Sequence, residues 1–390
     1  MAADGDPAAF RQFIVKLHSR CNLSCTYCYV YHHADQSWRD RPGVMSAETI
    51  DAMASRIGAH AHRHGLREVV VVLHGGEPLL AGPDVLDRTV TAIRDALAPS
   101  TVPEFTVQTN GTLIDDRWLS LFHRHRIGVG ISLDGVGAAH DRHRTFANGR
   151  GSFHLVRRAL RALGRPEHRD VYAGLLCTID LANDPVDVYE GLLEFAPPEI
   201  DLLLPLGNWV HRPPGRTADH RDTPYADWLI AVFDRWFDAP RGTGVRIFES
   251  LIALLVGGRS ETEAVGLDSA HAITIETDGA LEVTDALKST AHGMGATGLT
   301  VHRDDLDAAL AHPGVRALRR GLSRLAPACR ACPVASVCGG GQYAHRYGAD
   351  GGFAHPSVYC PDLFRLVRHI EGRLSSELVA RRARAAAGAA

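Results

Sequence analysis

The sequence predicts an α/β protein in two parts: a parallel sheet covered by helices, then a small cysteine-rich α+β module. Three observations lead to this fold class. Between residues 10 and 205, short β-branched runs alternate with amphipathic helical stretches, and six such units in series imply a parallel sheet. Residues 205–221 then have the proline and glycine content of a loop. Four of the eight cysteines follow, between residues 329 and 360.

The expected strands are rich in β-branched and aromatic residues and are Phe13–Leu17, Glu68–Leu73, Phe105–Thr109, Gly128–Leu133, Tyr172–Ile179 and Asp201–Leu204. The helices expected between them are Ala47–Arg63, Asp84–Leu97, Asp115–Arg124, Phe153–Leu163 and Pro185–Glu194. Ser46 is placed to cap the first helix. A further amphipathic helix, Tyr225–Trp236, is expected to turn Trp228, Phe233 and Trp236 toward the core and to bridge the two parts.

Length and composition exclude several classes of protein. A chain of 390 residues with 45% hydrophobic and 22% charged residues can bury a large core. The net charge of −3 argues against a general nucleic-acid or membrane-surface binder, and no apolar run approaches the roughly 18–20 residues of a membrane span. Residues 1–7 lack the features of a signal peptide. The cysteines form two groups, with Cys177 left over and expected to be buried, which indicates metal binding in a reducing, cytoplasmic setting.

The first cysteine group, Cys21-x3-Cys25-x2-Cys28, directly follows the first expected strand. Three thiolates can hold three irons of a [4Fe–4S] cube and leave the fourth iron open for a ligand that is not protein. A zinc site or a set of buried thiols is the alternative, but a structural zinc site requires four ligands. After the second strand comes His74-Gly75-Gly76-Glu77-Pro78. Its two glycines let the backbone approach a ligand closely, and Glu77 can lie near a cationic amine.

These motifs resemble those of the radical S-adenosylmethionine (SAM) superfamily. The resemblance implies a partial six-unit (β/α) barrel, open along one side, with its ligands at the C-terminal ends of the strands. It also implies that the open iron binds the amino and carboxylate groups of SAM, and that an electron from the cluster splits SAM to give a 5′-deoxyadenosyl radical. The residues that match the SAM contacts of the superfamily are Tyr27, Gly75, Gly76, Glu77, Gln108, Asn110, Ser132 and Arg144.

Plainer interpretations of these motifs stay open. The Asn110-Gly111 and Asp134-Gly135 pairs at the ends of two strands are also typical of simple turns. Arg144, expected at the SAM carboxylate, is equally compatible with a surface salt bridge.

The second cysteine group comprises Cys329, Cys332, Cys338 and Cys360. Four thiolates suffice for a closed site, and zinc is one candidate. Behind a radical SAM barrel, the pattern resembles the SPASM domain, which holds auxiliary [4Fe–4S] clusters. When the SPASM spacing is laid on this chain, one cluster keeps all four cysteines. The positions of the other cluster fall on Glu263, Ser269, Thr284 and Gln342. We therefore expect two [4Fe–4S] clusters in total, one that binds SAM and one auxiliary.

Residues 277–285 keep the hairpin of that module, and Asp285 falls where sulfatase-maturing relatives place an acidic general base. A carboxylate there can take the proton that an oxidised substrate loses. A turn-capping role for Asp285 is the alternative.

Several further segments resemble the FxsB-type radical SAM/SPASM peptide maturases over about residues 10–375. They are Lys16–Leu23, Cys28–Trp38, Cys338–Tyr347 and Pro356–Cys360. The resemblance implies a ribosomally made precursor peptide with a leader as substrate. It also implies a flavodoxin- or ferredoxin-type electron donor, and cross-linking of a side-chain Cβ to an aromatic ring two residues away, which forms a cyclophane. Thioether or ether cross-linking, epimerisation and sulfatase maturation are alternatives within the class. A non-catalytic iron–sulfur or zinc scaffold is the alternative outside it.

The domain boundaries expected from these patterns are 10–215 for the barrel, 216–260 for the helical bridge and 261–375 for the SPASM-like module. An Ala/Arg-rich tail at 376–390 is expected to fray.

Overall fold

A computed structural model describes residues 9–388 apart from 218, 220, 240, 241, 268–270, 319 and 320. Its first six strands are β1 (Gln12–His18), β2 (Glu68–Gly75), β3 (Val102–Thr109), β4 (Ile127–Ser132), β5 (Tyr172–Thr178) and β6 (Glu199–Leu203). Each strand overlaps one of the six expected from the sequence. They pair in sequence order and all run parallel. The predicted parallel sheet is therefore confirmed.

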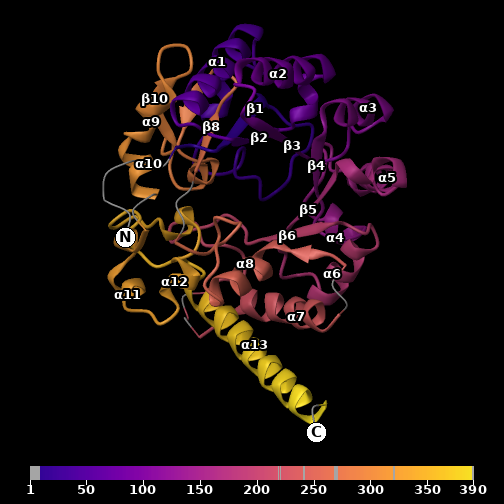
Figure 1. Cartoon of the computed structure of the whole chain (residues 1–390), viewed down its shortest axis with the longest axis vertical. Helices are drawn as coiled ribbons and strands as arrows, with labels where there is room; N and C mark the ends of the chain where they lie inside the picture. The colour runs from indigo at the N-terminus through magenta and orange to yellow at the C-terminus, as the bar shows by residue number, and fades with distance from the viewer. Residues whose placement is uncertain are drawn as a thin grey trace.

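Helices cover the outer side of this sheet (Figure 1). They are α1 (Ala47–Arg63), α2 (Pro83–Ala96), α3 (Asp116–His125), α4 (Ala138–Asp141), α5 (Phe153–Leu163) and α6 (Pro185–Leu193), with short 3-10 turns η1 (Ser37–Asp40), η2 (Pro78–Ala81) and η3 (Pro166–Val171). Ser46 caps α1 as expected, because its Oγ accepts a hydrogen bond from the Thr49 amide at 3.1 Å.

The two faces of the sheet meet different surroundings. In β2, Val69, Val71 and Leu73 are buried, and burial of such a side chain contributes about 1.5–3 kcal/mol. The intervening Val70 and Val72 instead line a cavity of about 710 Å³ in the lumen of the sheet. β1 pairs with β8 (Ala272–Ile275) and not with β6, so the curved sheet stays open, as the predicted partial barrel requires.

The sheet continues into the C-terminal half of the chain. At one edge, β7 (Gly244–Val245) pairs with β6. At the other edge, β8 pairs parallel with β1, and the antiparallel strands β9 (Ala280–Glu282) and β10 (Ala296–Thr300) follow. A hairpin is expected at 277–285; the structure forms it slightly earlier, from β8 and β9 over residues 272–282. One sheet therefore crosses the boundaries expected at residues 215 and 261.

Helices and short turns complete the C-terminal half and are α7 (Pro224–Asp238), α8 (Arg246–Leu255), η4 (Asp285–Ser289), α9 (Leu306–Leu310), α10 (Pro313–Leu318), η5 (Gly321–Arg324), α11 (Pro327–Arg330), α12 (Ala335–Cys338), η6 (Tyr343–Arg346) and α13 (Cys360–Gly388). Trp228, Phe233 and Trp236 of α7 are buried, as expected, and so is Cys177. α13 continues through residues 376–388, where the sequence led us to expect a frayed tail; alanine and arginine are strong helix formers.

Candidate functional site

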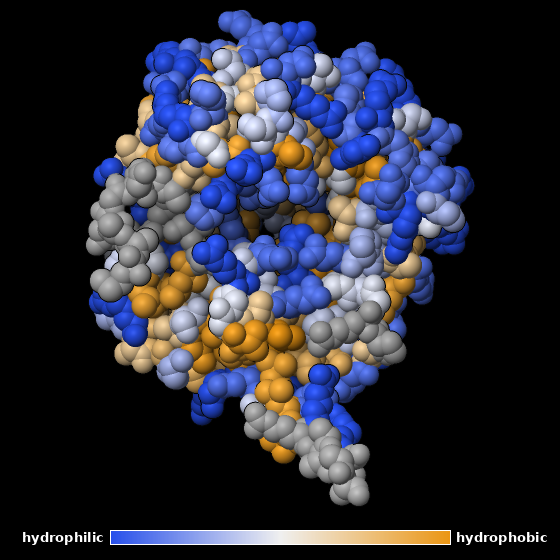
Figure 2. Space-filling view, in the orientation of Figure 1, coloured by the Kyte–Doolittle hydropathy of each residue, from blue (hydrophilic) through white to orange (hydrophobic). Residues whose placement is uncertain are grey.

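A cavity of about 280 Å³ lies at the C-terminal ends of the barrel strands, and the space-filling view shows a hollow near the middle of the molecule (Figure 2). It is lined by the three N-terminal cysteines and by every residue expected to contact SAM. These residues are Cys21, Cys25, Cys28, Tyr27, Gly75, Gly76, Glu77, Gln108, Asn110, Ser132 and Arg144. Ligands of α/β barrels bind at this end of the strands. The fold thus gathers predicted residues from five separate stretches of sequence around one space.

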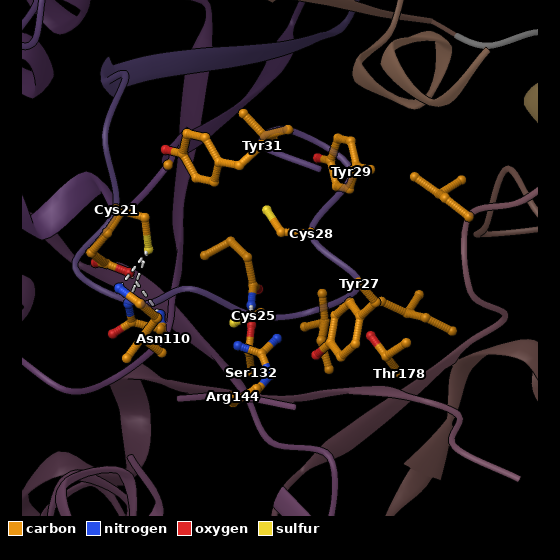
Figure 3. Close-up of a pocket in the computed structure, with 18 of the residues that line it drawn as sticks. Cys21, Cys25, Tyr27, Cys28, Tyr29, Tyr31, Asn110, Ser132, Arg144 and Thr178 are labelled. Carbon is orange, nitrogen blue, oxygen red and sulfur yellow. Dashed lines mark hydrogen bonds between the residues drawn. The ribbon is translucent and has the colours of Figure 1, made fainter. Parts of the chain in front are cut away.

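The three thiols lie on the loop between β1 and α1, around the cavity (Figure 3). Burial raises the pKa of Cys21 to about 12 and that of Cys25 to about 11, and it also raises the pKa of Cys28. Such thiols need a bound cation in order to become thiolates. Among the described residues that line the cavity, there is no fourth cysteine. This donor set fits a [4Fe–4S] cluster with one iron left for a ligand that is not protein.

Arg144 enters the cavity as half of a buried ion pair. Its Nε lies 2.9 Å from Oδ2 of Asp134, and its guanidinium lies 5.8 Å from the centre of the Tyr27 ring. Burial alone would lower the pKa of Arg144, but Asp134 raises it well above its usual range. Arg144 is therefore a fixed positive charge in the cavity wall and not a surface residue.

Asp134 organises this side of the cavity, a role that the sequence did not reveal. It accepts hydrogen bonds from the Tyr27 hydroxyl and, at 3.0 Å, from the Thr178 amide, in addition to its contact with Arg144. The Ser-Leu-Asp-Gly motif marked its position, but the motif is equally typical of a turn. Asp134 thereby joins the cysteine loop to the ends of β4 and β5.

Glu77 is buried and ties the end of β2 to the end of β3. Its carboxylate accepts hydrogen bonds from the Thr109 hydroxyl at 2.7 Å, the Asn110 amide at 2.8 Å and the Leu79 amide at 3.0 Å. A carboxylate offers about four lone-pair sites, so three are used inside the protein. Burial raises the pKa of Glu77. The residue lines the cavity, as expected, and it also braces the loop that carries the two glycines.

Packing explains why Gly76 carries no side chain. A Cβ atom there would lie 1.8 Å from the Tyr31 hydroxyl and 2.5 Å from the Arg20 carbonyl oxygen. The sequence had attributed this glycine to close approach of a ligand. The structure adds the close approach of the cysteine loop itself.

Polar side chains of β3 and β4 form another part of the wall. The Gln108 side-chain amide donates to the Ser132 hydroxyl at 3.0 Å. The Asn110 amide donates to the Asn22 side chain at 2.9 Å and lies 3.6 Å from the Cys21 sulfur. These bonds connect the strand ends to the cysteine loop, so the predicted SAM contacts also fix the position of the thiols.

Asp285, the expected general base, lies outside this wall. It is buried and ion-paired with Lys16, and it accepts a hydrogen bond from the Tyr29 hydroxyl at 3.3 Å. Burial would raise its pKa, but Lys16 and Lys288 lower it to about 2, which makes the carboxylate a weak proton acceptor at neutral pH. Tyr29 and His74 line the cavity, whereas Asp285 does not. The role of Asp285 as a base stays a prediction. A proton from the cavity would have to reach Asp285 through a cavity-lining neighbour such as Tyr29.

The other four cysteines surround a second, smaller cavity of about 80 Å³. Cys329, Cys332, Cys338 and Cys360 come from the region of α11, α12 and the start of α13. Burial raises the pKa of Cys338 to about 11 and that of Cys360 to about 12. Four converging thiols fit a closed tetra-thiolate site, for either an iron–sulfur cluster or zinc.

The four positions of the other SPASM cluster hold no thiol. Thr284 caps η4, Gln342 precedes η6, and Glu263 is exposed. Ser269 lies outside the described residues.

The sequence of this chain is similar to those of known proteins. The model of the Radical SAM superfamily matches residues 15–175. A serine-type anaerobic sulfatase-maturating enzyme of Klebsiella aerogenes is 27% identical over 352 residues, which cover 87% of this chain and 81% of that protein. A cysteine-type anaerobic sulfatase-maturating enzyme of Clostridium novyi is 26% identical over 280 residues, covering 68% of this chain and 71% of the other.

Solved structures share the fold. Native anSMEcpe with bound AdoMet has a TM-score of 0.80 to this chain at 21% identity, covering 94% of this chain and 98% of that one. A second structure of the same protein, with AdoMet and a Cp18Cys peptide, has a TM-score of 0.79. Such likeness at low identity shows a common fold. This chain therefore has the radical SAM fold, as predicted.

The fold, the family model and the relatives agree with the predicted resemblance to radical SAM maturases. The Radical SAM model over residues 15–175 and the AdoMet bound in a solved neighbour agree with the predicted cofactors, SAM and [4Fe–4S] clusters. The relatives named above are sulfatase-maturating enzymes, so these comparisons do not support the narrower resemblance to the FxsB type. Within the described residues, no helix is long and apolar enough to cross a membrane.

Proposed function

We propose that this protein is a radical SAM enzyme that modifies a peptide at a side-chain carbon. The observation that carries the proposal is the single cavity that gathers three thiols and all eight expected SAM contacts at the strand ends. Cys21, Cys25 and Cys28 would hold the SAM-binding [4Fe–4S] cluster. When bound, the cluster and SAM together supply a 5′-deoxyadenosyl radical able to take a hydrogen atom from an unactivated carbon.

The chain's own residues position the reactants. Arg144 offers a fixed positive charge for the SAM carboxylate, because Asp134 and the Tyr27 ring hold it in place. Glu77 keeps the glycine loop against the ends of β2 and β3, next to the expected SAM amino group. Catalysis of this kind depends on placing one C–H bond within reach, so a braced wall favours a single product.

Cross-linking of a side-chain Cβ to an aromatic ring, which gives a three-residue cyclophane, is the proposed outcome. One wall of the cavity supports it, because that wall is aliphatic and suits a bulky aromatic side chain better than a small polar one. Its members lie in β5, at the end of β6 and directly after β6, and are Leu176, Leu203, Leu204, Pro205 and Leu206. The same apolar wall keeps water away from the reacting carbon.

Sulfatase-type maturation is the second candidate, and the comparisons favour it. Both curated relatives are sulfatase-maturating enzymes, and one solved neighbour was obtained with a peptide. Hydrogen abstraction at the Cβ of serine or cysteine, followed by loss of one electron and one proton, would give a carbon–oxygen or carbon–sulfur double bond. This outcome needs no aromatic ring in the substrate.

Both outcomes require an acceptor for one electron and one proton. Cys329, Cys332, Cys338 and Cys360 would hold an auxiliary [4Fe–4S] cluster able to take up one electron, and we assign the proton to a path that ends at Asp285. A precursor peptide with a leader and a flavodoxin- or ferredoxin-type donor are the proposed partners. All eight cysteines are unpaired, which is consistent with a reducing, cytoplasmic setting.

Asp285→Asn tests the proton assignment. The variant is expected to form 5′-deoxyadenosine at the normal rate and to release product more slowly. Full product yield would remove Asp285 from the mechanism.

Anaerobic reconstitution and assay of 5′-deoxyadenosine test the core proposal, since an iron–sulfur or zinc scaffold would form none. Short peptides with an aromatic residue two positions from the candidate carbon would then be examined by mass spectrometry. Cross-linking and oxidation of serine both remove two hydrogens, so mass alone does not separate them, whereas epimerisation leaves the mass unchanged. A hydrazide probe labels only the aldehyde, and loss of fragmentation across three residues marks the cross-link. Labelled, freely fragmenting product would replace the cyclophane with sulfatase-type maturation.

A further inference from the structure

Arg346 is a buried arginine without an acidic partner. It lies in η6, and its side chain is almost fully buried. Within the part of the chain that the structure describes, no ion pair joins it to a carboxylate, and its Nη1 atom has no hydrogen-bond partner. A buried charge without compensation is costly. Groups other than a carboxylate must therefore stabilise the positive charge of this guanidinium.

Three consecutive carbonyl groups hold the guanidinium in place. Nε of Arg346 donates to the carbonyl of Gly340 at 2.9 Å, and Nη2 donates to those of Gly339 and Gly341 at 2.6 and 2.7 Å. All three glycines adopt positive φ angles of 59°, 75° and 67°, which side chains disfavour. A Cβ on Gly340 would lie 2.9 Å from Nη2 of the arginine. The tri-glycine turn is thus folded closely around Arg346.

The same turn begins at the four-thiol site. Gly339 directly follows Cys338, and Gly340 lines the cavity of the four cysteines. The Gly341 amide donates to the carbonyl oxygen of Cys338 at 3.0 Å, which closes the turn onto the backbone of that cysteine. The turn therefore lies between the cavity of the four cysteines and the arginine, with its three carbonyl groups directed toward the arginine. Successive amides in such a turn make a site suited to negative charge.

The charge of Arg346 also reaches the thiols. Nε of the guanidinium contacts the carbonyl of Gly340, a residue that itself lines the cavity of the four cysteines. Burial lowers the pKa of Arg346 to about 10, so it remains charged at neutral pH. A [4Fe–4S] cluster with four thiolates carries a net negative charge, which grows by one when the cluster takes up one electron. Positive charge and N–H···S contacts stabilise that reduced state and raise the reduction potential.

We propose that Arg346, held by the carbonyls of Gly339–Gly341, is the counter-charge that raises the reduction potential of the auxiliary cluster. It is a positioning residue, since it touches the turn and not the substrate. The inference rests on the proposed function, in which this cluster accepts one electron when the product forms.

Potentiometry followed by electron paramagnetic resonance tests the inference without SAM or peptide. The full chain would carry Cys21→Ala, Cys25→Ala and Cys28→Ala, so that the signal comes from the auxiliary site alone. Arg346→Met is expected to lower the midpoint potential while iron content stays near four per chain. Arg346→Lys keeps the charge but loses the three-carbonyl geometry. Its midpoint potential is expected to lie between those of the parent chain and the Met variant. Arg56→Gln is the control and should leave the potential unchanged. It removes a partly exposed arginine of α1 that is paired with Asp305.

Equal potentials for Arg346→Met and the parent chain would overturn the inference. If the Met variant loses its cluster, Arg346→Gln, which removes the charge but keeps a polar side chain, decides: a lowered potential supports the inference, and an unchanged one overturns it. Zinc at this site would give no redox signal and would also overturn it. Failure of the proposed function would show separately, as an absence of 5′-deoxyadenosine from the unmodified chain.

Discussion

The two cysteine sites of this chain differ in the number of thiols and in the space around them. The N-terminal site has three thiols at the edge of a cavity of about 280 Å³ with polar side chains in its wall. The C-terminal site has four thiols around about 80 Å³, with mainly small and apolar neighbours. Burial raises the pKa of thiols at both sites. The difference indicates that thiol count and free space together decide whether a site admits a ligand that is not protein.

Removing one thiol from each site gives the largest contrast. Cys25→Ala is expected to abolish formation of 5′-deoxyadenosine, because the open cluster loses one of three anchors. Cys338→Ala is expected to lower the iron content by about four per chain and to leave SAM cleavage intact. Iron analysis and chromatography of 5′-deoxyadenosine measure both effects. Loss of SAM cleavage in both variants would contradict the division of roles.

Asp134→Asn tests whether the polar wall is needed at the open site. The variant keeps the shape of Asp134 but removes the charge that pairs with Arg144. We expect SAM cleavage to fall by about 10–100-fold, the usual effect of losing a residue that orients a ligand-binding group. Asp180→Asn, which removes a carboxylate paired with the more exposed Arg142 and His143, is the matched control. Equal rates of SAM cleavage in the two variants would contradict the role assigned to Asp134.

Gly76→Ala sharpens the comparison on the side of packing. The new methyl group would meet the Tyr31 hydroxyl and the Arg20 carbonyl, so overpacking should lower the free energy of unfolding by about 1–3 kcal/mol. Gly43→Ala is the control, because nothing lies within 4 Å of the added atom. Chemical denaturation of the two variants measures the difference, and equal stability would show that the loop can adjust.

The smallest expected effect concerns the buried ion pairs between the N-terminal and C-terminal parts of the chain. Glu282 of β9 contacts Lys288 and also Arg41, which lies in the N-terminal part. Burial and Glu276 raise the pKa of Glu282 to about 7. A carboxyl whose pKa is raised on folding stabilises the folded state most at low pH, and this contribution is lost as pH rises through its folded pKa.

Between about pH 5 and 8, the wild-type chain should therefore lose about 1–2 kcal/mol relative to Glu282→Gln. Denaturation curves at several pH values measure this. A parallel pH dependence of the two proteins would contradict the raised pKa.

Most of the barrel could be predicted from the sequence because its signals are local. The β-branched run at Glu68–Leu73 and the capped helix after Ser46 depend on neighbours within a few residues. The cysteine spacing and the Gly-Gly-Glu loop were equally informative, and the structure places both at one cavity. The pairing of β8 with β1 was not predicted, because it joins segments more than 250 residues apart whose short apolar pattern fits many partners.

The charged contacts of the site also could not be predicted from the sequence. Asp134 looked like a turn residue until the fold placed Arg144 and Tyr27 against it. The sequence suggested Asp285 as a general base or as a turn cap, and only the tertiary structure shows Lys16 beside it. Side chains that meet across the fold leave no periodic pattern in a sequence, so both were found only in three dimensions.

The hydrogen bonds between β1 and β8 limit how this protein can be divided. A fragment ending near residue 260 would expose one flank of β1, a row of unsatisfied amides and carbonyls that invites aggregation. The C-terminal module is thus a needed edge cover for the barrel as well as a carrier of thiols. That second duty gives a physical reason why such a module would persist in a chain where one of its two metal positions has no cysteines.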